Sequence, residues 1–163
     1  MLFRSSGPAL TELEEVVTGW LRQMLGLSTA WSGVIQDTAS SSTLVALLCA
    51  RERATGFALA RGGLQGTSAP LAIYHSLHAH SSVEKAALLA GFGKENLRPI
   101  PVDGAQAMDT AALAAAIAAD RARGVVPAAI VATTGTTATT ALDPVAAMAA
   151  IADRKSTRLN SSH

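Results

Sequence analysis

The fold of this chain is organised around one stretch, Ala79-His80-Ser81-Ser82-Val83-Glu84. It follows an apolar run, Leu71–Tyr74, that predicts a buried strand, and it opens an apolar-periodic run that predicts a helix. Ser81 followed three residues later by Glu84 matches a capping box, which predicts that this helix begins at Ser81. His80 is therefore expected at a strand-to-helix turn, where an α/β sheet presents its functional side chains. Taken alone, such a histidine can also be a simple packing residue of the loop.

The rest of the chain alternates strands with helices around this turn. The expected elements are helices over 11–25, 44–53, 81–91, 109–122 and from 143 onward, and strands over 33–36, 71–74, 97–102 and 127–133. A Gly-rich segment over 56–70 is expected to be a surface loop. Two prolines place the strand over 97–102 at an edge of the sheet. This order predicts an α/β fold with a mostly parallel sheet and flanking helices.

Capping residues mark three further helix starts. Thr11 with Glu14 matches a second capping box, and the helix behind it has an apolar face that needs a partner. Asp109 is expected to cap the Ala-rich helix over 109–122. Asp143, followed by proline, is expected to cap the last helix.

Composition narrows the class of protein. The 163 residues are 49% hydrophobic with a formal net charge of +1, which offers no electrostatic attraction for DNA, RNA or an acidic membrane. No apolar run is long enough to cross a bilayer. The single cysteine, Cys49, cannot form an internal disulfide, so a reducing, cytoplasmic setting is expected.

The last segment, residues 153–163, departs sharply from the Ala-rich pattern before it. It resembles the conceptual translation of a widely used sequencing adapter. We therefore expect residues 153–163 to be a non-native tail and residues 1–152 to be the N-terminal, incomplete part of a larger domain. The natural gene product is expected to continue beyond Ala152.

Three polar corners follow the ends of expected strands: Thr38–Ser40, His80 and Thr136–Thr137. The carboxyl ends of parallel strands can converge on one crevice, so these corners are candidates for one site. The first corner is rich in hydroxyls and begins a helix, where free amides and partial positive charge favour a phosphate. The alternative is an ordinary N-cap, since Ser and Thr are preferred there. No dinucleotide fingerprint or P-loop motif is present, which disfavours a nucleotide site and a Rossmann oxidoreductase.

These corners resemble those of the pyridoxal-phosphate-dependent amino-acid decarboxylases, in particular the aromatic-L-amino-acid decarboxylase type of group II. The matching stretches, in order, are Thr11-Glu12-Leu13-Glu14, Gly33-Val34-Ile35-Gln36 with Thr38-Ala39-Ser40, Ala79-His80-Ser81-Ser82-Val83-Glu84-Lys85-Ala86 and Val131-Ala132-Thr133-Thr134-Gly135-Thr136-Thr137. The resemblance covers about residues 7–152. The glutamate-decarboxylase branch usually differs around the histidine and the first corner.

The resemblance implies part of the large domain of a fold-type-I transferase, with pyridoxal 5'-phosphate as cofactor. In this comparison Ala39 and Ser40 would bind the cofactor phosphate, and Thr137 would lie beside the cofactor. His80, the implied catalytic residue, would stack on the pyridine ring and assist in proton handling on the substrate carbon. The implied reaction is decarboxylation of an aromatic L-amino acid to the amine and CO₂ in a full-length homodimer.

The chain also departs from the family pattern. Asp37 stands where a small neutral residue is usual, and we expect its carboxylate to point away from the phosphate turn. The family's Schiff-base lysine and its acidic partner for the ring nitrogen belong to motifs that do not occur here, and Lys85, Lys94 and Lys155 are the only lysines. The fragment alone is therefore expected to be inactive.

Two alternatives stay open. The parent protein could be another fold-type-I enzyme, such as an aminotransferase or a desulfurase, or the fragment could be non-catalytic and at most a weak phosphate binder. Neither the particular amino acid nor the choice between decarboxylation and oxidative deamination follows from these residues, because the segments that decide them in the family are not in the sequence.

Overall fold

The computed structural model describes residues 7–66 and 69–157. It forms two compact units, Met1–Ala39 and Ser40–His163. The end of the expected non-native tail, residues 158–163, lies outside the described residues. Within the described ranges, no helix combines the length and apolarity that a membrane span requires.

The first unit contains α1 (Pro8–Met24), which begins one turn before the capping box that we expected at Thr11. Gly7 is its N-cap, and Pro8 at the first position supplies a φ already suited to a helix. Thr11 consequently lies inside the helix, where its hydroxyl donates to the Gly7 carbonyl at 3.2 Å. No residue of α1 is buried, and large apolar side chains such as Trp20 and Met24 are exposed.

The short strand expected over 33–36 does not form, and this prediction was wrong. Val34 and Ile35 are exposed in an irregular segment. The amide of Ile35 donates to Oε1 of Glu14 at 2.7 Å rather than to a neighbouring strand. A β-branched pair predicts a strand only where a partner strand is available, and the first unit has none among its described residues.

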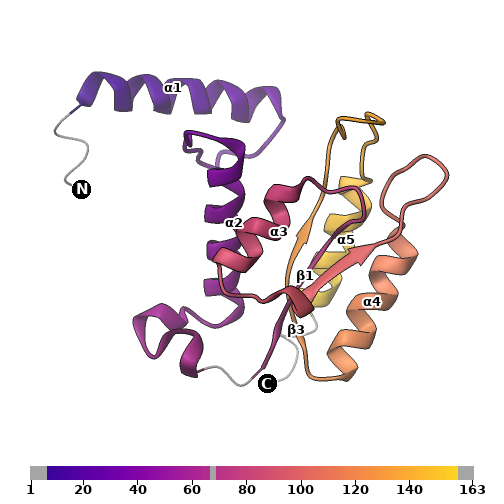
Figure 1. Cartoon of the computed structure of the whole chain (residues 1–163). Coiled ribbons are helices and arrows are strands. Elements are labelled where there is room, and N and C mark those ends of the chain that lie inside the picture. Colours follow the sequence, from indigo (N-terminus) through magenta and orange to yellow (C-terminus); the bar gives the residue numbers. More distant parts are fainter. Residues whose placement is uncertain (1–6, 67–68, 158–163) are drawn as a thin grey trace. The chain divides into compact units, whose positions relative to one another are not determined.

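The second unit is built on a three-stranded parallel sheet in the order β2-β1-β3 (Figure 1). Its strands are β1 (Leu71–Ser76), β2 (Leu97–Ile100) and β3 (Val126–Val131). Tyr74 on the central strand is in register with Arg98 on β2 and with Ile130 on β3. The sequence prediction of a parallel sheet with the proline-containing strand at an edge is confirmed.

Helices flank both faces of this sheet. They are α2 (Ala39–Ala54), α3 (Ser81–Leu89), α4 (Thr110–Ala122) and α5 (Val145–Thr157), with short 3-10 turns at Ala58–Ala60, Gly63–Gly66 and Lys94–Asn96. The helix expected from residue 44 starts earlier, so its first turn includes the hydroxyl-rich run 40–43. α2 and α3 pack on one face, where Arg51 of α2 donates to the Ala90 carbonyl at 2.7 Å.

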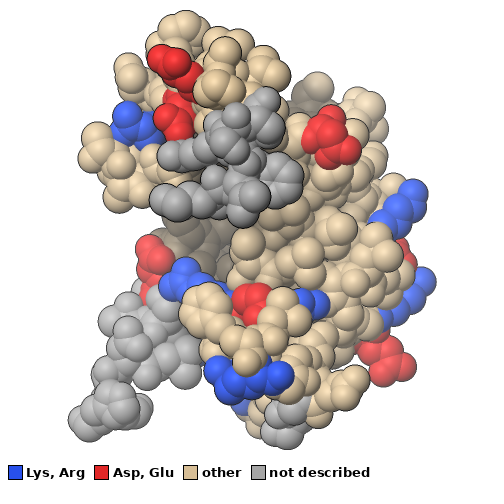
Figure 2. All heavy atoms as spheres, turned by 90° about the vertical axis from the view of Figure 1, so that its left-hand side faces the viewer, with Lys and Arg blue, Asp and Glu red and all other residues tan. Residues whose placement is uncertain are grey.

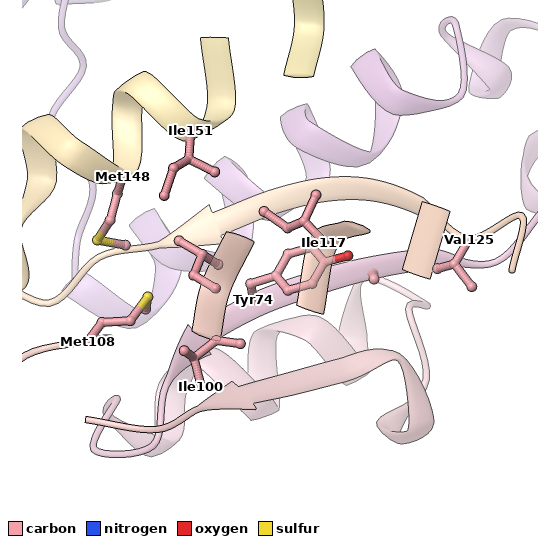
Figure 3. Close-up of a cluster of buried hydrophobic side chains, with 9 residues drawn as sticks. Tyr74, Ile100, Met108, Ile117, Val125, Met148 and Ile151 are labelled. Atoms are coloured by element: carbon pink, nitrogen blue, oxygen red, sulfur yellow. The ribbon is translucent and has the colours of Figure 1, made fainter. Parts of the chain in front are cut away.

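The central strand is buried on both faces, which explains the continuous apolar run of its first four residues, Leu71–Tyr74. Ala72 and Tyr74 point toward α4 and α5, as Figure 3 shows for Tyr74. Leu71 and Ile73 point toward α2 and α3. The first cluster is completed by Ile100, Met108, Leu113, Ile117, Val125, Met148 and Ile151, and the second by Leu47, Ala86, Ala87, Ala90 and Phe92.

The core also holds a charged residue that the sequence analysis missed. Asp120 of α4 is fully buried, and Arg98 of β2 donates to both of its carboxylate oxygens, at 2.9 and 3.1 Å. Arg123 donates to Oδ1 from the surface side.

The face of the molecule in Figure 2 is mostly uncharged, with acidic and basic side chains interspersed.

Candidate functional site

His80 lies between β1 and α3, and it is the N-cap of α3. Its Nδ1 accepts a hydrogen bond from the Ser82 amide at 3.1 Å and lies 2.9 Å from the Ser82 hydroxyl oxygen. The capping box expected from Ser81 and Glu84 is therefore wrong. The ring nitrogen of His80 reaches the amide two residues ahead as an Asp or Asn side chain would, and Glu84 pairs instead with Lys94 at 3.2 Å.

In the loop after β3, the two threonines that we predicted as one polar corner have different surroundings. Thr136 is used by the loop itself: its hydroxyl lies 2.6 Å from that of Thr139 and accepts from the Ala141 amide at 3.2 Å. Gly135, with φ of +95°, makes the turn that leads into this arrangement. Thr137 is exposed at the loop tip. Of the two hydroxyls, the one at position 137 is available to a ligand.

Asp143 has a role that its sequence context did not reveal. It precedes α5 as expected of a cap, but Oδ1 accepts from the Met108 amide at 2.8 Å and Oδ2 from the Thr133 amide at 2.7 Å. Only 6% of the residue is exposed. One carboxylate thus joins the loop after β2 to the start of the loop that carries Thr137. An Asp-Pro pair signals a helix start and gives no sign of these distant partners.

The first turn of α2 contains the other predicted residues. Ala39 and Ser40 are its first two residues, and both are exposed. The amides of a first turn have no partner within the helix and carry partial positive charge, which suits an anion. Asp37 is exposed, and the outward orientation of its carboxylate stays a prediction.

The topology places the His80 and Thr137 corners at one end of the second unit. β1 and β3 are adjacent and parallel, so the loops that carry His80 and Thr137 both start at the carboxyl ends of the strands. Figure 1 shows that α2 starts at this end as well. Of the lysines, Lys85 is exposed on α3, and Lys94 forms the surface pair with Glu84. Within the described part of the chain, no group of His, Cys, Asp and Glu could hold a metal ion.

Comparison with known proteins gives one consistent family. A family model described as the pyridoxal-dependent decarboxylase conserved domain matches residues 1–160. Aromatic-L-amino-acid decarboxylase of Bos taurus is 44% identical over 142 residues, which cover 80% of this chain and 28% of that protein. Tryptophan decarboxylase 1 of Oryza sativa subsp. japonica is 40% identical over 165 residues, which cover 91% of this chain and 31% of that protein.

A solved structure supports the same relationship. The crystal structure of Oryza sativa TDC with PLP and tryptamine matches with a TM-score of 0.83 at 38% identity, covering 93% of this chain and 32% of that one. The chain therefore spans less than a third of the length of each of these three proteins.

Proposed function

Because this chain belongs to the pyridoxal-dependent decarboxylase family, we propose that a protein carrying it converts an aromatic L-amino acid to the corresponding amine and CO₂. The proposed cofactor is pyridoxal 5'-phosphate. The observation that carries the proposal is the position of His80, which caps α3 beyond the carboxyl end of β1. The chain that holds it is similar to aromatic-L-amino-acid and tryptophan decarboxylases.

The exposed residues at the carboxyl ends of the strands fit the chemistry of the cofactor. A phosphate dianion suits the first turn of α2, where we assign it to the backbone of Ala39 and to Ser40. The flat imidazole of His80 suits a flat aromatic ring, and the exposed hydroxyl of Thr137 suits a polar ring substituent. When bound, the cofactor would withdraw electrons from the substrate carbon that loses CO₂.

The contribution of this chain is binding and orientation. The start of α2 would fix the phosphate, and His80 would cover one face of the ring while its outer nitrogen meets the substrate. Asp143 would keep the loop of Thr137 in place through its bond to the Thr133 amide. We propose that the lysine that anchors the cofactor lies outside this sequence, because Lys85 and Lys94 sit on the exposed surface of the second unit and Lys155 belongs to the expected non-native tail. We propose the same for the acidic partner of the ring nitrogen, because its family motif does not occur here.

We further propose that the whole protein is a cytoplasmic homodimer. The exposed apolar side chains of α1, among them Leu13, Trp20 and Met24, support a second copy as the partner. The exposed, unpaired thiol of Cys49 supports a reducing compartment.

The test is an assay of the complete gene product that contains residues 7–152. Purified protein is incubated with L-tryptophan, L-3,4-dihydroxyphenylalanine, L-histidine or L-glutamate, with and without pyridoxal 5'-phosphate, and CO₂ and amine are measured. We expect equal amounts of both products from an aromatic substrate, only with the cofactor. With 2-oxoglutarate added as an amino acceptor, a keto acid without CO₂ would indicate an aminotransferase instead, and aldehyde with ammonia and CO₂, formed only in the presence of O₂, would indicate oxidative deamination.

A further inference from the structure

The imidazole of His80 is held on one edge by a single neighbouring residue. Both contacts to Nδ1 come from Ser82, through its backbone amide at 3.1 Å and its hydroxyl at 2.9 Å. Ser82 is half-buried in the first turn of α3, so its own position is set by the helix. Among the described residues, no other group forms a hydrogen bond to this ring.

These contacts determine where the ring carries its proton. A backbone amide can only donate, so Nδ1 must be the acceptor and cannot carry a proton while the cap exists. The Ser82 hydroxyl can rotate to donate as well. The neutral ring is then protonated at Nε2, on the edge that faces away from the helix.

We propose that Ser82 is a positioning residue for His80. It locks the ring orientation and keeps Nε2–H as a hydrogen-bond donor directed away from α3. This inference rests on the proposed function for its catalytic meaning, since Nε2–H is then the group that meets the substrate. The tautomer and the anchoring of the ring are properties of the chain itself.

The first experiment needs neither cofactor nor substrate. Nitrogen-15 NMR of the labelled chain at neutral pH reports the protonation of each His80 ring nitrogen, and relaxation reports the mobility of the ring. We expect an unprotonated Nδ1 and a protonated Nε2 in the wild type and in Ser81→Ala, an exposed neighbour that serves as the control. Ser82→Ala keeps the amide but loses the hydroxyl that helps to hold the ring against it, so the bond from the amide to Nδ1 should be formed for a smaller share of the time. The Nδ1–H population and the ring mobility should then both rise, whereas Ser82→Thr should return both to the wild-type values. A protonated Nδ1 in the wild type, or a Ser82→Ala ring identical to it, would overturn the proposal.

The second experiment measures turnover of the complete gene product. Loss of one neutral hydrogen bond that orients the ring should lower kcat of Ser82→Ala by about three- to tenfold, with KM changed less and Ser82→Thr near the wild type. If the wild type makes amine and Ser82→Ala has unchanged kcat, the positioning role is refuted while the proposed function stands. If the wild type makes no amine, the proposed function is refuted, and the NMR result decides the anchoring of the ring by itself.

Discussion

The hydroxyl of Tyr74 on β1 donates a 2.8 Å hydrogen bond to Oδ2 of Asp120 on α4, and both residues are fully buried. Burial by itself would raise the pKa of Asp120, but hydrogen bonds from Arg98, Tyr74 and Arg123 outweigh it and lower that pKa. Burial, and then the bond to Asp120, raise the pKa of Tyr74. The carboxylate is thus an ionised group in the core with its oxygens satisfied, and it fixes how α4 lies on the sheet.

Removing this carboxylate should destabilise the chain more than removing any one of its donors. Asp120→Ala leaves the Arg98 guanidinium and the Tyr74 hydroxyl without their partner, which should cost about 3–5 kcal/mol in the free energy of unfolding. Tyr74→Phe removes one hydrogen bond and should cost about 1–3 kcal/mol, because the buried carboxylate loses a donor. Arg123→Ala is the control, since its side chain is 64% exposed and should contribute about 1 kcal/mol or less. Urea denaturation checks all three, and equal effects of Asp120→Ala and Arg123→Ala would contradict the interpretation.

Stability should depend on pH at both ends of the scale. The lowered pKa of Asp120 means that its contribution is present above the unfolded value of about 3.9 and is lost as pH falls through the folded pKa. The raised pKa of Tyr74 means that its contribution is complete below about pH 10 and declines as pH rises further. Unfolding free energies measured across pH should therefore show a shallower acid limb in Asp120→Asn and a shallower alkaline limb in Tyr74→Phe. Limbs identical to the wild type would show that these two groups do not carry the dependence.

Asp143 should matter for two loops at once. Asp143→Ala removes the acceptor for the amides of Met108 and Thr133, and we expect a loss of about 3 kcal/mol or more from two charge-assisted hydrogen bonds. Hydrogen exchange should accelerate at both amides. Asp109→Ala is the matched control, because that carboxylate caps α4 locally and its loss should cost about 1 kcal/mol. Unchanged exchange at Thr133 in Asp143→Ala would show that the bridge does not hold this loop.

Two substitutions at His80 separate capping from catalysis. His80→Ala removes the cap of α3 and should cost about 1 kcal/mol, whereas His80→Asn supplies a preferred capping side chain and should keep the stability of the wild type. Both remove the imidazole, so in the complete gene product both should lower amine formation by about a hundredfold or more. Full activity in His80→Asn would mean that the histidine serves only as a cap.

Local pattern predicted much of this fold. The apolar runs identified β1 and β3, two prolines placed β2 at an edge, and Asp109 was identified as the cap of α4. Such features depend on residues a few positions apart, so periodicity and capping rules capture them. The same rules led to the His80 corner and, together with the motifs around residues 11, 33 and 131, to the family that the comparisons show.

Only the tertiary structure decided which groups meet across the layers. The partners of Asp120 and Asp143 lie on other strands and loops, and residues 33–36 stay irregular because the first unit offers no strand to pair with. The N-cap of α3 is His80 and not Ser81 as expected, because the ring nitrogen of His80 accepts from the Ser82 amide. The backbone geometry of the turn decides which of these two adjacent residues is the cap. Sequence alone thus predicted the order of strands and helices from α2 onward and pointed to the polar corners of the candidate site. Packing determined which carboxylates are buried, because their partners come from distant positions, whereas the geometry of the turn at Ser82 determined which edge of the His80 ring is left for a ligand.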